Sequence, residues 1–143
     1  MKRSLLVEKD GGPLAIIVAG ANVPDQKLLA ATIDAVVVER PEPEPEWPQH
    51  LCLDKGYDNP TGWGVIVDYD YTPHIQLIRD LRPPRKKRHK PRRWVVERTL
   101  AWLSKCRAVL IRWDKKACNY LGLLKLACAL LWYRRYRRLT ARR

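Results

Sequence analysis

Apolar runs of two different periods alternate along this 143-residue chain, and the alternation limits the fold more than any other feature. Runs rich in β-branched residues predict strands, whereas apolar residues spaced three or four positions apart predict helices. The expected strands cover residues 4–7, 14–21, 50–53 and 72–78, and the expected helices cover residues 26–38, 60–67, 93–105 and 115–138. Strands that alternate with helices predict an α/β fold, with a partly parallel sheet and helices on its faces.

Turn and loop signals separate these elements. The Asp-Gly-Gly sequence at residues 10–12 lies between the first two strands and predicts a β-hairpin. Asp25 is expected to cap the first helix. Residues 41–49 alternate proline with glutamate, which excludes a helix and favours an extended surface loop, and residues 80–92 form a basic loop with three prolines. We expect a single domain over residues 1–143, because the length matches one domain.

The charge of the chain is divided unevenly. Residues 1–80 hold 7 Lys/Arg and 13 Asp/Glu, a net charge of −6, whereas residues 81–143 hold 21 Lys/Arg and 2 Asp/Glu, a net charge of +19. The two densest clusters are Arg82, Arg85, Lys86, Lys87, Arg88, Lys90, Arg92 and Arg93, and then Arg134, Arg135, Arg137, Arg138, Arg142 and Arg143. Such clusters favour a nucleic-acid partner, because each bound cation releases counterions from the phosphate backbone.

Two other interpretations of the basic half stay open. One is an anionic membrane surface, because the last helix is amphipathic and basic at its end. The other is a solvated basic face with no partner. No run reaches the roughly 18 apolar residues that a membrane span needs. We therefore expect a cytoplasmic protein that does not cross a membrane.

The cysteines and histidines predict no metal cluster. Cys52, Cys106, Cys118 and Cys128 form no C-x-x-C pair, and we expect buried free thiols in a reducing compartment. The three histidines are scattered along the sequence and lie at no zinc-finger spacing from the cysteines.

Two carboxylates are candidates for chemistry. Asp54 directly follows a predicted strand and precedes a glycine turn, and Glu97 lies in a largely apolar helix as one of two acids in the basic half. A carboxylate among cations is a plausible Mg²⁺ ligand, because Mg²⁺ combines few carboxylates with water and phosphate oxygens. The alternatives are that Asp54 bonds its own backbone in a turn and that Glu97 pairs with Arg93 one helical turn away. Trp94 and Trp102 are expected to pack in the core, with base stacking as the alternative.

Five stretches of the chain occur in the same order in one family. They are GGPLAIIVAGANVPDQKLL (11–29), LCLDKGYDNPTG (51–62), YTPHI (71–75), RRWVVERTLAWLSKCR (92–107) and NYLGLLKLACALLWYRR (119–135). These stretches resemble the C-terminal half of the catalytic domain of DDE-class insertion-sequence transposases, over nearly the whole chain. The resemblance implies a ribonuclease-H-like mixed sheet flanked by helices, incomplete at the N-terminus because the first strand is missing. It also implies cleavage of transposon-end DNA and transfer of the freed strand to target DNA.

The same resemblance assigns roles to individual residues. Asp54 matches the second catalytic aspartate in the motif D-x-G-Y, and Arg93 and Glu97 match the motif R-x-x-x-E. The two carboxylates are then ligands of a two-Mg²⁺ site, and Arg93 contacts phosphate near the metals. The expected DNA-binding residues are Arg85, Lys86, Lys87, Arg88, Lys90, Arg92, Arg93, Arg98 and Lys105.

The chain also departs from the family pattern. No residue matches the first catalytic aspartate, the family's N-terminal DNA-binding region is absent, and Lys90 replaces a frequent tyrosine. Two origins fit these departures: the downstream product of a split gene, completed by an upstream-encoded N-terminal half, or a truncated relic. In both cases we expect the chain alone to be inactive, and to self-associate through an exposed sheet edge. A non-catalytic, basic DNA-binding protein is the alternative function. The implied location is the bacterial cytoplasm, in association with the nucleoid.

Overall fold

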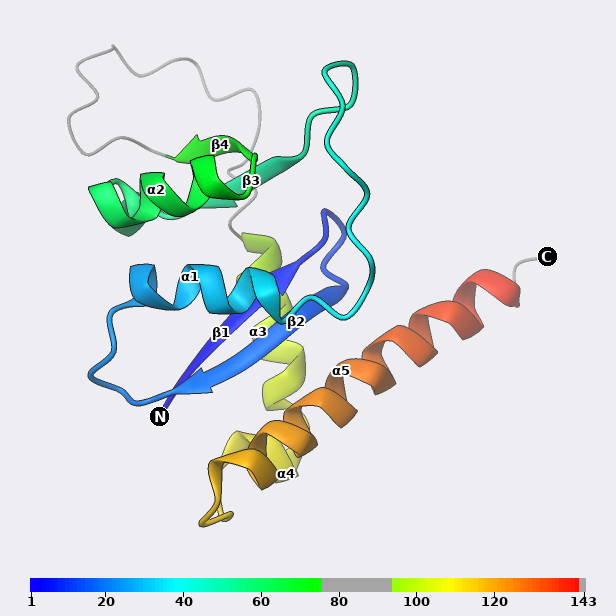
Figure 1. The fold of residues 1–143 in the computed structure, drawn as a ribbon. Helices are drawn as coiled ribbons and strands as arrows, with labels where there is room; N and C mark the ends of the chain where they lie inside the picture. The colour runs from blue at the N-terminus through cyan, green and yellow to red at the C-terminus, as the bar shows by residue number, and fades with distance from the viewer. Residues whose placement is uncertain (76–93, 142–143) are drawn as a thin grey trace.

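A computed structural model describes residues 1–75 and 94–141 of the chain (Figure 1). In chain order the elements are β1 (Lys2–Val7), β2 (Pro13–Ala19), α1 (Asp25–Asp34), β3 (His50–Leu53), the 3-10 helix η1 (Lys55–Tyr57), α2 (Pro60–Asp68), β4 (Thr72–Ile75), α3 (Trp94–Ser104), α4 (Arg107–Leu110) and α5 (Ala117–Thr140). Strands alternate with helices, so the expected α/β class is confirmed. The basic loop expected at residues 80–92 and the end of the strand expected over 72–78 lie outside the described residues.

The described strands do not form the one mixed sheet that we expected. β1 pairs with β2 in an antiparallel sheet, and β3 pairs with β4 in a separate parallel sheet. A single sheet would need a strand that pairs with both β1 and β3, and the described residues supply none. The expected mixture of antiparallel and parallel pairing is therefore present, but it is divided between two separate sheets.

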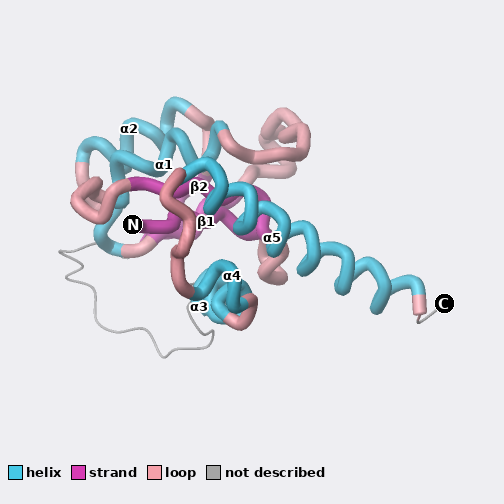
Figure 2. Tube along the Cα trace, turned by 90° about the horizontal axis from the view of Figure 1, so that it is seen from below, coloured by secondary structure: helices cyan, strands magenta, loops and turns pink. Residues whose placement is uncertain are grey.

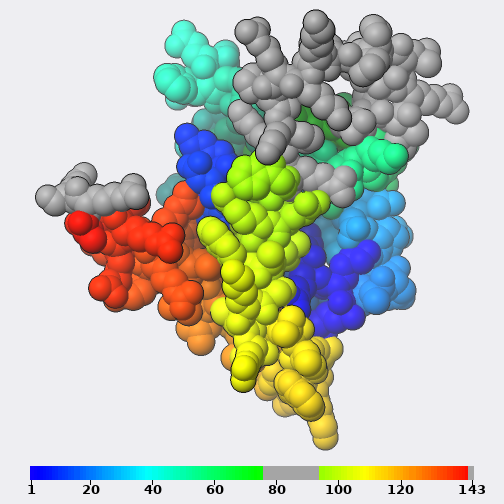
Figure 3. All heavy atoms as spheres, turned by 180° about the vertical axis from the view of Figure 1, so that it is seen from behind, coloured from blue at the N-terminus to red at the C-terminus, as the bar shows by residue number. Residues whose placement is uncertain are grey.

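The predicted hairpin is confirmed and has helices on both faces. Gly11 has a φ of +93°, the left-handed region that glycine enters without a steric penalty. Side chains alternate between the two faces of a strand. Ser4 faces α1, where its hydroxyl lies 2.7 Å from the hydroxyl of Thr32. Leu5 instead packs against the core cluster of α3, α4 and α5, and this arrangement places α1 in front of the hairpin and α3 behind it (Figures 1 and 3).

The prediction that Asp25 caps the first helix was wrong. The N-cap residue of α1 is Pro24, and Asp25 is the first helical residue. The Asp25 carboxylate instead pairs with the Lys2 ammonium at 3.1 Å, and its place in the first turn also suits the helix dipole. The helix ends at Asp34 and not at residue 38, because three consecutive valines, residues 36–38, are poor helix formers.

The remaining helices lie close to their predicted positions. α2 begins after Asn59, whose side chain accepts a hydrogen bond from the N–H of Gly62 at 3.0 Å. A Cβ at Gly62 would lie 2.3 Å from the carbonyl oxygen of Tyr57. Glycine at this position therefore allows the backbone of Tyr57 to lie against the first turn of α2. α3 ends one residue earlier than expected, and the first residue expected in this helix lies outside the described residues. α5 begins and ends two residues later than expected. The short helix α4 was not predicted.

Two apolar clusters form the core. The larger one joins the hairpin to α3, α4 and α5, and its buried members are Ile16, Leu103, Val109, Tyr120, Leu124, Ala127 and Cys128. The smaller one joins α1, β3 and α2 through Leu29, Ile33, Leu51 and Ile66. The predicted apolar stripe of α5 therefore faces the hairpin, as its helical spacing requires. α1 contacts both the hairpin and α2, so it lies between the two sheets (Figure 1).

The cysteines differ from the prediction of buried thiols. All four are free, but only Cys128 is buried, and Cys52 and Cys118 are exposed. Burial raises the pKa of the Cys128 thiol to about 11. The other cysteines are less buried because they lie at element ends or on the outward face of a strand, which the apolar pattern alone does not reveal.

Candidate active site

Asp54 lies directly after β3, at the carboxyl end of a parallel strand. Its side chain accepts a hydrogen bond from the N–H of Lys55 at 2.7 Å and caps the 3-10 helix η1. This local bond is the turn role that the sequence left open, and it holds the carboxylate at the strand end. A Cβ on Gly56 would meet no atom within 4 Å, so the turn beside Asp54 is open to a ligand.

Tyr57 lies in the electrostatic field of two carboxylates at this strand end. Burial is the largest cause that raises the pKa of its phenol, and the negative charges of Asp25 and Asp54 raise it further. The phenol therefore stays protonated at neutral pH.

Glu97 lies in the first turn of α3 and is exposed. The buried positions of this helix are Val95, Thr99 and Leu103, which recur every four residues and face the hairpin. Glu97 therefore projects from a helix that is held on one side by apolar packing. A carboxylate in a first helical turn is also favoured by the partial positive charge of the helix N-terminus.

Arg98 is held by neighbours on both sides. Its guanidinium lies 4.5 Å from the ring centroid of Trp94 and 5.3 Å from that of Trp102, and its Nη2 donates to the carbonyl of Asp10 at 2.6 Å. The expectation of core tryptophans was wrong, since Trp94 is 47% exposed and Trp102 is 39% exposed. Both rings flank a cation at a helix spacing of four residues, and this stack attaches α3 to the hairpin turn.

The other predicted DNA-binding residues are only partly described. Lys105 is exposed just after α3. Arg85, Lys86, Lys87, Arg88, Lys90, Arg92 and Arg93 lie outside the described residues. The structure therefore places Asp54 directly after β3, Glu97 and Arg98 on α3, and Lys105 directly after α3. The role of Arg93 stays a prediction.

The carboxylates fit Mg²⁺ by their chemistry, because Mg²⁺ takes hard oxygen ligands. Across residues 1–75 and 94–141, no three His, Cys, Asp or Glu side chains are grouped so as to hold a metal ion. The structure therefore shows no assembled metal site among the described residues, and a role for Asp54 and Glu97 as ligands stays a prediction.

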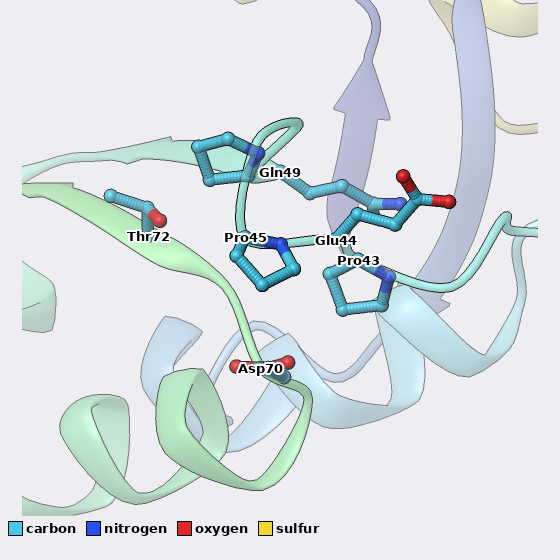
Figure 4. A pocket seen from close by; sticks show the side chains of 7 residues that line it. Pro43, Glu44, Pro45, Gln49, Asp70 and Thr72 are labelled. Atoms are coloured by element: carbon cyan, nitrogen blue, oxygen red, sulfur yellow. The ribbon is translucent and has the colours of Figure 1, made fainter.

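The hollow drawn in Figure 4 is formed by the Pro/Glu segment. It measures about 270 Å³, and its lining consists of Pro43, Glu44, Pro45, Pro48, Gln49, Asp70 and Thr72. Arg40 fixes this segment, because its Nη1 donates to the carbonyl of Tyr69 at 2.6 Å and its guanidinium lies 4.0 Å from the ring centroid of Tyr71. The hollow contains none of the predicted catalytic residues.

The end of α5 extends away from the rest of the molecule (Figures 1 and 2). We call residues 133–140 the α5 arm. Its exposed residues include Arg134, Arg137 and Arg138, and the tyrosines at 133 and 136 are 58% and 64% exposed. Arg135 is different, because its Nη1 pairs with the carboxylate of Glu8 at 2.6 Å. The arm thus offers cations and aromatic rings together. None of the described helices is long and apolar enough to cross a membrane.

Comparison with known proteins shows the family of the chain. The family model described as the transposase DDE domain matches residues 1–132, and the chain belongs to this family. It is also 34% identical over 139 residues to a protein of Burkholderia cepacia named as a transposase for insertion sequence element IS402. That alignment covers 96% of this chain and 64% of the relative, so the chain spans slightly less than two thirds of the relative's length. No solved structure matches the chain.

Proposed function

We propose that this chain carries part of the site at which a DNA transposase cleaves and transfers DNA strands. The observation that carries the proposal is the family match over residues 1–132, which includes both Asp54 and Glu97. The placement of Asp54 at a strand end and of Glu97 on a packed helix supports it. Asp54 follows strand β3, which packs in the smaller apolar cluster through Leu51, and Glu97 lies on α3, which packs in the larger cluster through Leu103.

The proposed roles follow from the side-chain chemistry. Asp54 and Glu97 hold Mg²⁺, and bound Mg²⁺ stabilises charge on the attacking and leaving oxygens of a displacement at phosphorus. Arg93 binds a phosphate oxygen pair through its guanidinium fork. Tyr57, which remains protonated, donates a hydrogen bond at the same strand end. Lys105 and the basic residues at positions 85–92 attract the DNA backbone.

We further propose a ribonuclease-H-like fold for the complete enzyme. Within the described residues β1 and β3 each pair on one side only, and a strand between them would join the two sheets. The proposed source of this strand is an upstream-encoded N-terminal half, which also provides the first catalytic aspartate. Without that half the chain is inactive or nearly so, and its strand edges favour self-association.

The α5 arm is the proposed surface for general DNA affinity. Three exposed arginines attract phosphates, and exposed tyrosine rings can stack on bases. This surface would serve equally in the second candidate function, a non-catalytic DNA-binding protein associated with the bacterial nucleoid. If Asp54 and Glu97 have no role in catalysis, the net charge of +19 over residues 81–143 favours the non-catalytic DNA-binding protein.

A nicking assay tests the catalytic proposal. The chain is combined with the product of the upstream reading frame and incubated with Mg²⁺ and duplex DNA from the end of the element. Nicking should require both chains, and Asp54→Asn or Glu97→Gln should lower its rate by about 100-fold or more. Asp68→Asn, an exposed acid at the end of α2, is the control and should keep the full rate. Full activity of the Asp54 and Glu97 variants would overturn the site, and nicking by the chain alone would overturn the need for a second half.

A salt titration tests the DNA-binding surface separately from catalysis. Replacing Arg134, Arg137 and Arg138 by Gln should reduce the slope of log affinity against log salt by about 2.7, because each phosphate contact contributes about 0.9. The control replaces three exposed lysines, Lys9, Lys27 and Lys125, and removes the same net charge. Equal slopes for the two triple variants would show that the α5 arm is not the contact surface.

A further inference from the structure

Two histidines meet on the second sheet, although the sequence shows them as scattered. In the parallel pairing of β3 with β4, Cys52 lies opposite His74, and His50 lies two residues before Cys52 on the same strand. Side chains alternate between the faces of a strand, so these three residues share one face. All three are exposed, whereas Leu51 on the opposite face is buried in the core. The polar face of this sheet therefore carries two imidazoles and a thiol.

The two imidazoles are in direct contact. Nε2 of His74 and Nδ1 of His50 are 2.9 Å apart, and the ring centroids are 4.9 Å apart with a tilt of 55°. One ring donates an N–H in this arrangement and the other accepts. The contact is exposed to water and belongs to neither apolar cluster, so core packing does not explain it.

This separation is close to what a metal ion requires. Zinc binds imidazole nitrogen at about 2.0–2.1 Å, and two such nitrogens in a tetrahedral shell lie about 3.3 Å apart. The observed 2.9 Å would have to widen by only about 0.4 Å, which small rotations of exposed rings can provide. When both rings are neutral, each can carry its proton on its other nitrogen. The lone pairs of His50 Nδ1 and His74 Nε2 can then both be directed at one metal ion, and neither ring has to lose a proton.

We propose that His50 and His74 form a two-imidazole site for a borderline divalent transition metal ion such as Cu²⁺, Ni²⁺ or Zn²⁺. Imidazole suits these ions, and affinity should follow the usual order with Cu²⁺ highest. No third His, Cys, Asp or Glu within the described ranges completes the set, so water occupies the other positions. A bound ion would connect β3 to β4 at their exposed face.

The site is distinct from the proposed Mg²⁺ carboxylates. Magnesium prefers oxygen ligands and does not compete for neutral imidazole. His50 lies four residues before Asp54, a distance of about 13 Å along an extended strand. A transition metal ion can therefore bind at the histidines while Mg²⁺ binds at Asp54. A negative result for the histidine site would leave the proposed Mg²⁺ site untouched, and the reverse also holds.

Metal titration of the full chain, without a histidine tag, tests this site. Ni²⁺ is added to the protein, and binding is measured by calorimetry and by competition with a chromogenic chelator. We expect one site in the unmodified chain, and at least a tenfold loss of affinity in His50→Gln and in His74→Gln. Each single variant should bind as weakly as the double variant, because one remaining imidazole gives no chelate. Mg²⁺ at the same concentration should give no signal.

Two variants serve as matched controls. His89→Gln removes the remaining histidine of the chain, and Cys52→Ser removes the neighbouring thiol. Both should bind Ni²⁺ as the unmodified chain does, and Ni²⁺ should raise the melting temperature of both but not of the two imidazole variants. The proposal is overturned if His50→Gln and His74→Gln keep the full affinity, or if His89→Gln or Cys52→Ser removes it. Circular dichroism without metal checks that every variant folds, as the exposure of His50 and His74 leads us to expect.

Discussion

The two small sheets are held by different kinds of contact. Side-chain hydrogen bonds to backbone carbonyls attach the hairpin to the C-terminal helices, and the bond from Arg98 to Asp10 is one of them. Thr99 donates to Gly11 at 2.8 Å, Trp132 to Pro13 at 2.7 Å and Arg3 to Val109 at 2.7 Å. The members of these pairs are 88, 119 and 106 residues apart, so the hairpin is fixed by the other end of the chain.

In the half that contains the second sheet, the described side-chain bonds join segments that lie closer together in the sequence. Tyr69 donates to Asp34 at 2.5 Å across 35 residues, and Arg40 reaches the carbonyl of Tyr69 across 29 residues. Helices pack on one of its faces, and the other face exposes His50 and His74. The two halves therefore differ in how they are held: the hairpin is covered by helices on both faces, whereas the second sheet leaves the face with His50 and His74 exposed.

The largest expected effect comes from the core of the hairpin half. Leu124 is fully buried in α5 against the hairpin cluster, so Leu124→Ala should reduce the free energy of unfolding by about 2–5 kcal/mol. Leu126 lies two positions further along the same helix and is 68% exposed, so Leu126→Ala should change it by less than about 0.5 kcal/mol. Urea unfolding followed by circular dichroism measures both values. Similar losses in the two variants would mean that α5 does not pack on the hairpin through this face.

A smaller effect is expected when one long-range hydrogen bond is removed. Thr99 is fully buried, so Thr99→Val leaves the Gly11 carbonyl without this donor and should reduce the free energy of unfolding by about 1–3 kcal/mol. Tyr69→Phe removes the corresponding bond to Asp34 in the second half, which is exposed to water. Its effect should be below about 1 kcal/mol, because water replaces the lost partner. If Tyr69→Phe lost more unfolding free energy than Thr99→Val, the hydrogen bond of the second half would be the more important one, contrary to the comparison above.

The sequence predicted the local elements well and the long-range contacts poorly. Periodicity located the hairpin, α2, α3 and α5, because those patterns depend on neighbours within a few residues. It did not show that Arg98 would lie between two tryptophan rings, because this position also depends on the hydrogen bond from Arg98 to the Asp10 carbonyl in the hairpin turn, which is distant in the sequence. Nor did it show the meeting of His50 and His74, although two histidines on strands predicted to be parallel were the available signal. Nor did it show that the described strands form two separate sheets, because pairing between distant strands has no local signature.

The last prediction tests the ionic contact that attaches α5 to the hairpin turn. Burial alone would raise the pKa of the Glu8 carboxyl, but N–H donors from Asp10 and Gly12 and the charge of Arg135 outweigh it and lower the pKa below 4.5. A depressed pKa stabilises the fold above the pKa of the unfolded chain, and this stabilisation disappears as the pH falls through the folded value. Glu8→Gln should therefore reduce the free energy of unfolding by about 1 kcal/mol at pH 6.

That difference between Glu8→Gln and the unmodified chain should shrink as the pH falls from 6 through the lowered pKa of Glu8, because the native carboxyl then also becomes neutral. Arg135→Gln provides the matched test from the other partner, since its guanidinium lies 2.6 Å from Glu8 and 3.6 Å from Asp10. It should show the same loss of stability at pH 6 and the same convergence at low pH. A penalty that stayed constant over this fall in pH would mean that Glu8 acts through packing and not through its charge. The hairpin would then be held by its buried hydrogen bonds and apolar contacts alone, which would make the contrast between the two halves sharper.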